Sequence, residues 1–68
     1  MIRFGRISSI ENGGDAVRVI MEPGQKVSTL LAVPDGVTVT ADDIGRRCCC
    51  AFSGPGIDGM MLAIFRGV

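Results

Sequence analysis

Turn-forming residues recur along the whole 68-residue chain at intervals of roughly 8 to 12 residues. Glycine and proline, together with asparagine and aspartate, supply the backbone angles of tight turns and interrupt helices. The turn segments are Asn12-Gly13-Gly14, Pro23-Gly24, Pro34-Asp35-Gly36, Gly45, Gly54-Pro55-Gly56 and Asp58-Gly59. Because this spacing leaves no room for a long helix, we expect a meander of short β-strands.

The segments between these turns carry the apolar alternation of β-strands. Residues 16–21 alternate most cleanly, and with residues 2–10 and the intervening Asn-Gly-Gly turn they predict a β-hairpin. Gly5 stands where a β-bulge can change which side chains of the first strand face inward. The further strands that we expect are residues 26–33, a short strand at 37–39, residues 46–52 and residues 59–65.

A short helical turn interrupts this series of strands. Thr40 is a favourable N-cap residue, the two aspartates that follow Ala41 would lie near the positive end of the helix dipole, and Gly45 favours termination. We therefore expect one helical turn near residues 41–45. For a single domain of residues 1–68, the predicted fold class is all-β, a small five- to six-stranded OB-like or SH3-like barrel.

The composition argues against several classes of function. The chain has no histidine, which is the commonest general base near neutral pH and the commonest metal ligand. A chain of 68 residues is also too small to enclose a deep catalytic cleft. We expect no enzymatic activity, no cofactor, no catalytic residue and no metal site. The seven basic and seven acidic residues balance, so the positive charge typical of nucleic-acid-binding proteins is missing.

No stretch of the sequence predicts insertion into a membrane. The longest uncharged stretch of the C-terminal half, residues 48–57, is interrupted by Gly-Pro-Gly. It falls short of the roughly 20 apolar residues that a spanning helix needs. The N-terminal residues also lack the apolar region of a signal peptide. We therefore expect a cytoplasmic location and no membrane partner.

Three consecutive cysteines, Cys48, Cys49 and Cys50, form the most conspicuous chemical feature of the chain. In a strand the first and third point to one side and the second to the other, so a zinc site would lack further ligands. A thiol nucleophile would have arginines nearby but no histidine to accept its proton. We expect these side chains to fill a tight barrel as small apolar groups. A thiol-based redox or metal protein is a third hypothesis.

All but one of the seven basic residues are arginines, which suit the recognition of phosphate or carboxylate. Single-strand binding by an OB fold also needs aromatic rings on which bases stack. The three phenylalanines, Phe4, Phe52 and Phe65, lie in runs where core positions are expected. Nucleic-acid binding is therefore the alternative function. Its candidate anion or nucleic-acid contacts are Arg3, Arg6, Arg18, Arg46 and Arg47.

The last predicted strand is apolar on both of its sides. Alternation can place only half of the run Met-Met-Leu-Ala-Ile-Phe at residues 60–65 inside a barrel. A contiguous exposed apolar patch usually marks an interface, and a short chain with little core gains stability by association. We expect a protein partner or a homo-oligomer. The candidate interface residues are Met61, Ala63, Phe65 and Ile57, or with the opposite alternation Met60, Leu62 and Ile64.

The order of these elements resembles a known family of barrels. An Ile-Arg-Phe-Gly-Arg-Ile start, an Ala-Val-Arg-Val strand, Asp-Ile-Gly-Arg-Arg at 43–47 and Asp-Gly-Met-Met-Leu-Ala at 58–63 follow one another. This pattern resembles the OB-type barrel domain of phage baseplate spike proteins, of valine-glycine-repeat spike proteins of type VI secretion, and of their small associated domains. The chain departs from it at residues 34–36, where the family has a proline-rich apolar stretch, and at Ala63, where the family prefers glycine.

The resemblance implies a function as well as a fold. It implies a non-enzymatic structural or adaptor module, similar to OB-like domains of phage tail or type VI secretion assemblies, which acts through protein–protein contacts. Such a protein would be made in the cytoplasm and could be incorporated into a phage or secretion particle. The alternative that the residues leave open is an OB-fold single-stranded nucleic-acid-binding protein.

Overall fold

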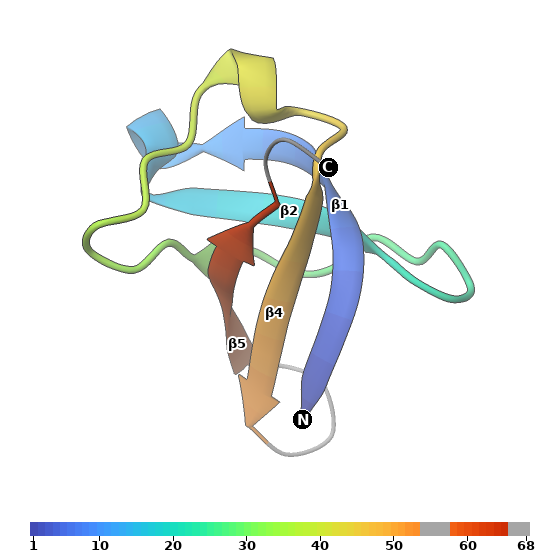
Figure 1. The fold of residues 1–68 in the computed structure, drawn as a ribbon. Coiled ribbons are helices and arrows are strands. Elements are labelled where there is room, and N and C mark those ends of the chain that lie inside the picture. The colour runs from blue at the N-terminus through green and yellow to red at the C-terminus, as the bar shows by residue number, and fades with distance from the viewer. Residues whose placement is uncertain (54–57, 66–68) are drawn as a thin grey trace.

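The computed structural model describes residues 1–53 and 58–65 of the chain (Figure 1). Five strands close into a barrel in the order β1-β2-β3-β5-β4, in which only β3 and β5 run parallel to each other. The elements are β1 (Ile2–Glu11), the 3-10 turn η1 (Asn12–Gly14), β2 (Ala16–Met21), β3 (Leu31–Ala32), the 3-10 turn η2 (Ala41–Asp43), β4 (Arg47–Ser53) and β5 (Asp58–Ile64). The predicted all-β class and small barrel are confirmed, and the arrangement is compatible with an OB-like barrel.

The barrel closes through β1. The first half of this strand pairs with β4 and the second half pairs with β2, so the strand bends between its two partners (Figure 1). Gly5 lies at the bend and pairs with both neighbours, with Met21 on β2 and with Cys48 on β4. A Cβ atom at Gly5 would lie 2.5 Å from the backbone oxygen of Ile20. Glycine is therefore needed here because β2 approaches the backbone of β1 too closely for any side chain.

The inward-facing residues of β1 change at a different position from the one that the sequence predicted. The register between β1 and β2 shifts between Ile7 and Ser9, so the bulge lies at Ser8. It allows Ile7 and Ile10 to face the same side: Ile7 is buried and Ile10 packs against the core. The predicted bulge at Gly5 is wrong, because the glycine accommodates the close approach of two backbones.

Side chains that alternate inward along the strands fill the barrel. Cys48 and Cys50 are fully buried, whereas Cys49 is half-buried on the outer side, as the alternation predicted. The core residues are Ile7, Val17, Val19, Met21, Leu31, Val39, Cys48, Cys50, Phe52 and Met61. The expectation that the cysteines fill the barrel is confirmed for the first and the third of them.

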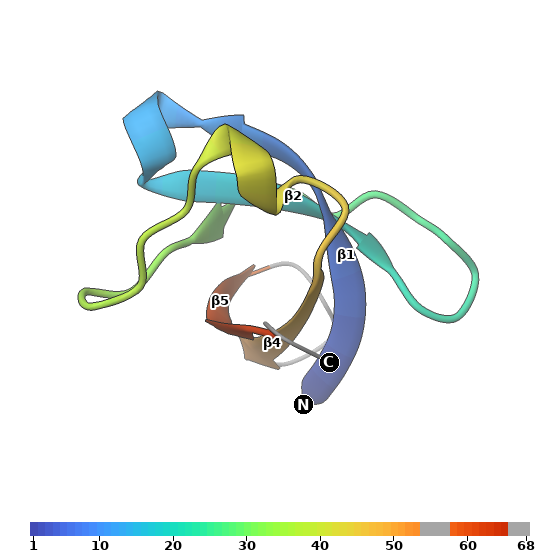
Figure 2. The same ribbon diagram turned by 45° about the horizontal axis from the view of Figure 1, so that its top comes forward.

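Two connections without regular strands extend on opposite sides of the barrel (Figure 2). In the first, the strand predicted at residues 26–33 is reduced to an isolated bridge between Val27 and Ile20 and the short strand Leu31–Ala32. The reason lies at Ser28, whose amide donates to the backbone oxygen of Val19 at 2.8 Å and whose hydroxyl accepts the Val19 N–H at 2.9 Å. A side chain thus replaces a ladder hydrogen bond, and the segment leaves the sheet.

The second connection contains the predicted helical turn but lacks the predicted short strand. Residues 37–39 have no strand pairing, and they approach the barrel as irregular chain with Val39 buried in the core. The helical turn is the 3-10 turn η2, which begins after Thr40. Its Asp43 carboxylate accepts the Thr40 N–H at 2.9 Å, and Gly45 follows with a positive φ of 92°.

We predict that Gly5→Ala lowers the free energy of unfolding by about 3 kcal/mol, because the new methyl group must push the backbone of β2 away from β1. The matched control is Gly24→Ala, since a Cβ atom there meets nothing within 4 Å and only the positive φ of 93° is unfavourable. This control is expected to cost about 1 kcal/mol. Urea unfolding of both variants measures the difference, and equal losses would contradict the proposed role of Gly5.

Candidate functional site

The outer side of β1, β4 and β5 carries a group of exposed apolar side chains. Residues paired across neighbouring strands point to the same side of a sheet, which places two rows of side chains across these strands. The rows are Ile2, Ala51 and Met60, and Phe4, Cys49 and Ala63. Leu62, the extra residue at a register shift in β5, is exposed beside them. We call the two rows and Leu62 the apolar face.

Large exposed apolar residues concentrate on this face. Ile2 is 55% exposed, Phe4 44%, and Met60 and Leu62 37% each. The other large apolar residues that are exposed in the described part of the chain are Met1, Val27, Leu30 and Ile44, which lie at the N-terminus and in connections. The apolar face is therefore a continuous surface on the paired strands of the barrel, which is typical of an interface.

The structure divides the candidate interface residues of β5 between the core and the outer surface. Met61 points into the core and is fully buried, so its side chain does not contribute to the outer surface. Leu62 interrupts the alternation, and Ala63 therefore faces outward although it follows Met61 by two residues. Phe65 is half-buried, and Ile57 lies outside the described residues. Of the opposite set, Met60 and Leu62 are exposed, whereas Ile64 packs against the core. Neither strict alternation therefore holds across this bulge.

Sequence reasoning missed the contribution of β1 to the site. Of the three phenylalanines expected in the core, only Phe52 is buried there, whereas Phe4 is exposed and Phe65 is half-buried. A signal for the outward orientation was present in the sequence. If Gly5 and Ile7 face inward on β1, Phe4 between Arg3 and Gly5 must face outward.

An arginine lies over two aromatic rings at one end of the apolar face. The ring centroids of Phe4 and Phe65 are 5.8 Å apart and the rings are tilted by 46°. The Arg47 guanidinium carbon lies 5.6 Å from the Phe4 centroid and 5.9 Å from the Phe65 centroid. Both distances are within the range of cation–π attraction. Arg47 therefore limits access to ring surfaces that would otherwise face solvent.

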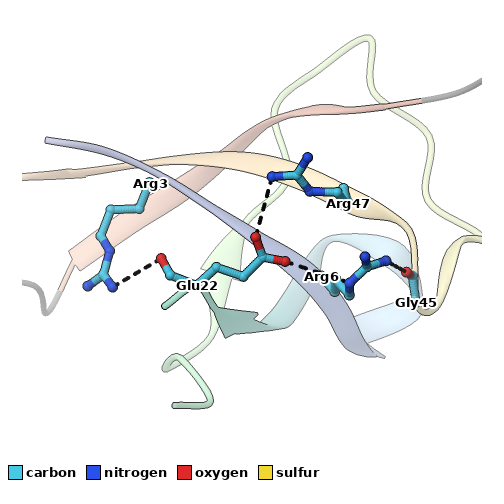
Figure 3. A network of polar contacts seen from close by, with 5 residues as sticks. All are labelled: Arg3, Arg6, Glu22, Gly45 and Arg47. Carbon is cyan, nitrogen blue, oxygen red and sulfur yellow. Dashed lines mark hydrogen bonds and ion pairs between the residues drawn. The ribbon is translucent and has the colours of Figure 1, made fainter. Parts of the chain in front are cut away.

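Three of the five predicted anion contacts converge on one residue, Glu22 (Figure 3). The Glu22 carboxylate pairs with Arg47 Nη2 at 3.3 Å and with Arg6 Nε at 3.6 Å, while Arg3 Nη2 donates to the Glu22 backbone oxygen at 3.4 Å. Arg6 Nη1 also donates to the backbone oxygen of Gly45 at 3.1 Å. Exposed ion pairs of this kind contribute about 0–1 kcal/mol each, so they order the arginines more than they stabilise the fold.

The other two predicted anion contacts lie elsewhere. Arg46 Nε is 3.0 Å from Oδ1 of the buried Asp43, so this arginine neutralises a core-facing carboxylate. Arg18 Nη1 donates to the backbone oxygen of Ser28 at 3.4 Å. The five arginines therefore do not form one basic surface. The Glu22 carboxylate partly balances the charges of Arg6 and Arg47, the two arginines that border the apolar face.

The cysteine run divides into a buried pair and one accessible thiol. The Sγ atoms of Cys48 and Cys50 are 4.0 Å apart inside the core. The hydrogen bond with Cys50, and then burial, raise the pKa of the Cys48 thiol far above its usual range. Cys49 lies on the apolar face in register with Phe4 and Ala63. The same hydrogen bond, from Cys48, lowers the pKa of the Cys50 thiol. Burial of both sulfur atoms in the core, rather than their protonation, therefore keeps reagents away from the pair.

Comparison with protein families, with curated proteins and with solved structures finds no match to the chain. The described residues also contain no helix of the length and apolar character that crossing a bilayer requires. Inference about function therefore depends on the surface of the barrel itself.

We predict that Ellman's reagent labels one thiol rapidly in the folded protein and three after unfolding in guanidinium, because Cys49 alone of the free cysteines is not fully buried. The control is Cys49→Ser, which is expected to lose the rapid phase while its far-UV spectrum is unchanged. Rapid labelling of all three thiols in the folded state would contradict the burial of Cys48 and Cys50.

Proposed function

We propose that the chain is a non-enzymatic structural or adaptor module that acts through protein–protein contacts, and that the apolar face is its contact surface. The observation that carries this proposal is the concentration of Ile2, Phe4, Met60 and Leu62 on the outer side of three paired strands. Because strands of a closed barrel hold these side chains in fixed positions, a partner can bind them without first ordering a loop.

The area that a stable interface needs is large compared with the surface of this small barrel, so the interface must cover a whole side of it. A stable interface buries about 800 Å² per partner. This is about a fifth of the 4272 Å² that the chain exposes, so a few scattered side chains cannot supply it. The β1–β4–β5 side is the part of the described surface on which large apolar residues occupy adjacent strands.

The first partner that we propose is a second copy of the chain. The apolar face is bordered by both signs of charge, since the Glu22 carboxylate lies beside Arg6 and Arg47. A twofold arrangement places the same patch on both sides of an interface, and such a patch must be self-complementary. Two apolar faces can meet in this way while each carboxylate approaches an arginine of the other copy.

The assembly that we propose for this module is a phage tail or a type VI secretion apparatus, in which it would be incorporated into the particle. Two independent features support the proposal. One is the order of short motifs along the sequence, which resembles that of barrel domains of spike proteins. The other is the small closed barrel, which is compatible with an OB-like domain.

We predict that the protein self-associates and that Ile2→Lys combined with Met60→Lys makes it monomeric, because two charges in one row of the apolar face oppose burial. Sedimentation equilibrium at protein concentrations up to about 1 mM measures the mass, and it detects association as weak as about −4 kcal/mol. The matched control is Leu30→Lys combined with Ile44→Lys, which adds the same charge at residues 45% and 51% exposed. This control is expected to associate as the unchanged protein does.

Two results would count against this function. The unchanged protein could remain monomeric over the whole concentration range, or both double variants could weaken association equally. The second result would indicate a general effect of added positive charge. Thermal unfolding of each variant shows whether the barrel persists, so a loss of association is not confused with a loss of fold.

One specific observation favours nucleic-acid binding as the second candidate function. The Phe4 ring is exposed and the Arg47 guanidinium lies 5.6 Å from its centroid, a combination of ring and cation that base stacking uses. However, Arg47 already covers this ring, and Glu22 pairs with both Arg6 and Arg47. Fluorescence anisotropy with an oligo-dT strand at low salt distinguishes the two functions. Binding that falls steeply with salt and is lost in Phe4→Leu would support nucleic-acid binding over protein docking.

A further inference from the structure

A separate pocket of about 230 Å³ opens at the end of the barrel where β1 begins and where β2 and β4 end. Met21 and Phe52, both buried core residues, contribute its apolar lining. Segment 26–29 of the β2–β3 connection lines another part of the pocket, and Arg3 lines it from β1. None of the pocket residues belongs to the apolar face, so the pocket is a distinct feature of the fold.

The pocket collects basic side chains that lack a carboxylate partner. Three arginines of the described chain, Arg6, Arg46 and Arg47, each form an ion pair within 4.0 Å. Within residues 1–53 and 58–65, no such pair is formed by Arg3 or by Lys26, and both line this pocket. The contact of Arg3 is a long hydrogen bond of 3.4 Å to a backbone oxygen. Most of its N–H donors therefore remain available to a ligand.

The position of Arg3 explains why its charge reaches the pocket. Arg3 pairs with the buried Cys50 on β4, so its side chain leaves β1 on the inward-facing side. Since the residue lies near the end of the strand, the guanidinium can emerge at the mouth of the barrel, where it is half-buried. A partly desolvated guanidinium forms stronger hydrogen bonds to an anion than one in bulk water does.

We infer that this pocket binds a small organic carboxylate with an apolar tail, whose carboxylate faces Arg3 and Lys26 and whose tail lies against Met21 and Phe52. Guanidinium and ammonium groups supply charge complementarity, and the two core residues supply an apolar surface. The volume is below the roughly 300 Å³ at which pockets for drug-sized ligands begin. The ligand class is therefore a short alkyl carboxylate rather than a nucleotide or a folded partner.

The test is an amide-resolved NMR titration of the ¹⁵N-labelled protein with octanoate, octanol and acetate. Octanoate is expected to shift the amides of residues that line the pocket, and octanol and acetate, which each lack one half of the ligand, are expected to bind at least about tenfold more weakly. Arg3→Gln and Lys26→Gln are each expected to weaken octanoate binding about tenfold. Arg6→Gln, which removes the same charge from β1 outside the pocket, is expected to leave it unchanged.

The inference is overturned if octanol binds as tightly as octanoate, if the shifted amides lie on the apolar face, or if Arg6→Gln weakens binding as much as Lys26→Gln does. Lys26 is exposed, and among residues 1–53 and 58–65 its side chain forms no ion pair, so Lys26→Gln is expected to fold and tests the inference even if Arg3→Gln does not fold. Because self-association is measured separately, failure of the pocket and failure of the proposed docking function are distinguishable.

Discussion

The structure depends on the ability of one strand, β1, to pair with two neighbours at once. Gly5 pairs with Met21 on β2 and with Cys48 on β4. Because Gly5 has no side chain, the backbone of β2 occupies the space that a Cβ atom would need. If β1 paired with only one of them, the barrel would stay open and leave unpaired strand edges. Closure thus fixes which residues of each strand face the core and which face solvent.

The outer surface follows from this constraint. A barrel of five short strands can enclose only one side of each strand, and the apolar residues of the other sides remain outside. On β1, β4 and β5 these residues fall in register, which produces the apolar face. The same closure brings the inward-facing Arg3 to the barrel end, where it lines a pocket of different chemistry. One backbone arrangement therefore supports two separate features, an apolar outer face and a pocket that combines apolar and basic side chains.

Local signals in the sequence predicted most of the fold. Features that depend on pairing between strands distant in the sequence could not be predicted from it. The hairpin at residues 2–21, the turn after Thr40 and the alternation of the cysteines all depend on near neighbours and are confirmed. The bulges at Ser8 and Leu62 depend on the register with other strands. The second bulge, which follows Met61, turns Ala63 outward although Met61 faces the core, so no strict alternation describes β5. The convergence of arginines on Glu22 likewise arises only when the strands meet.

The proposed docking of the apolar face on a second copy of the chain can be observed directly. Amide NMR spectra recorded between about 50 μM and 1 mM test this docking residue by residue. If the dissociation constant of the dimer lies in this range, the fraction of dimer changes with concentration and the signals of interfacial amides shift. We expect the amide signals of Ile2, Phe4, Cys49 and Met60 to shift with protein concentration and those of β2 to stay constant. Spectra that do not change with concentration, or changes centred on β2 and β3, would contradict it.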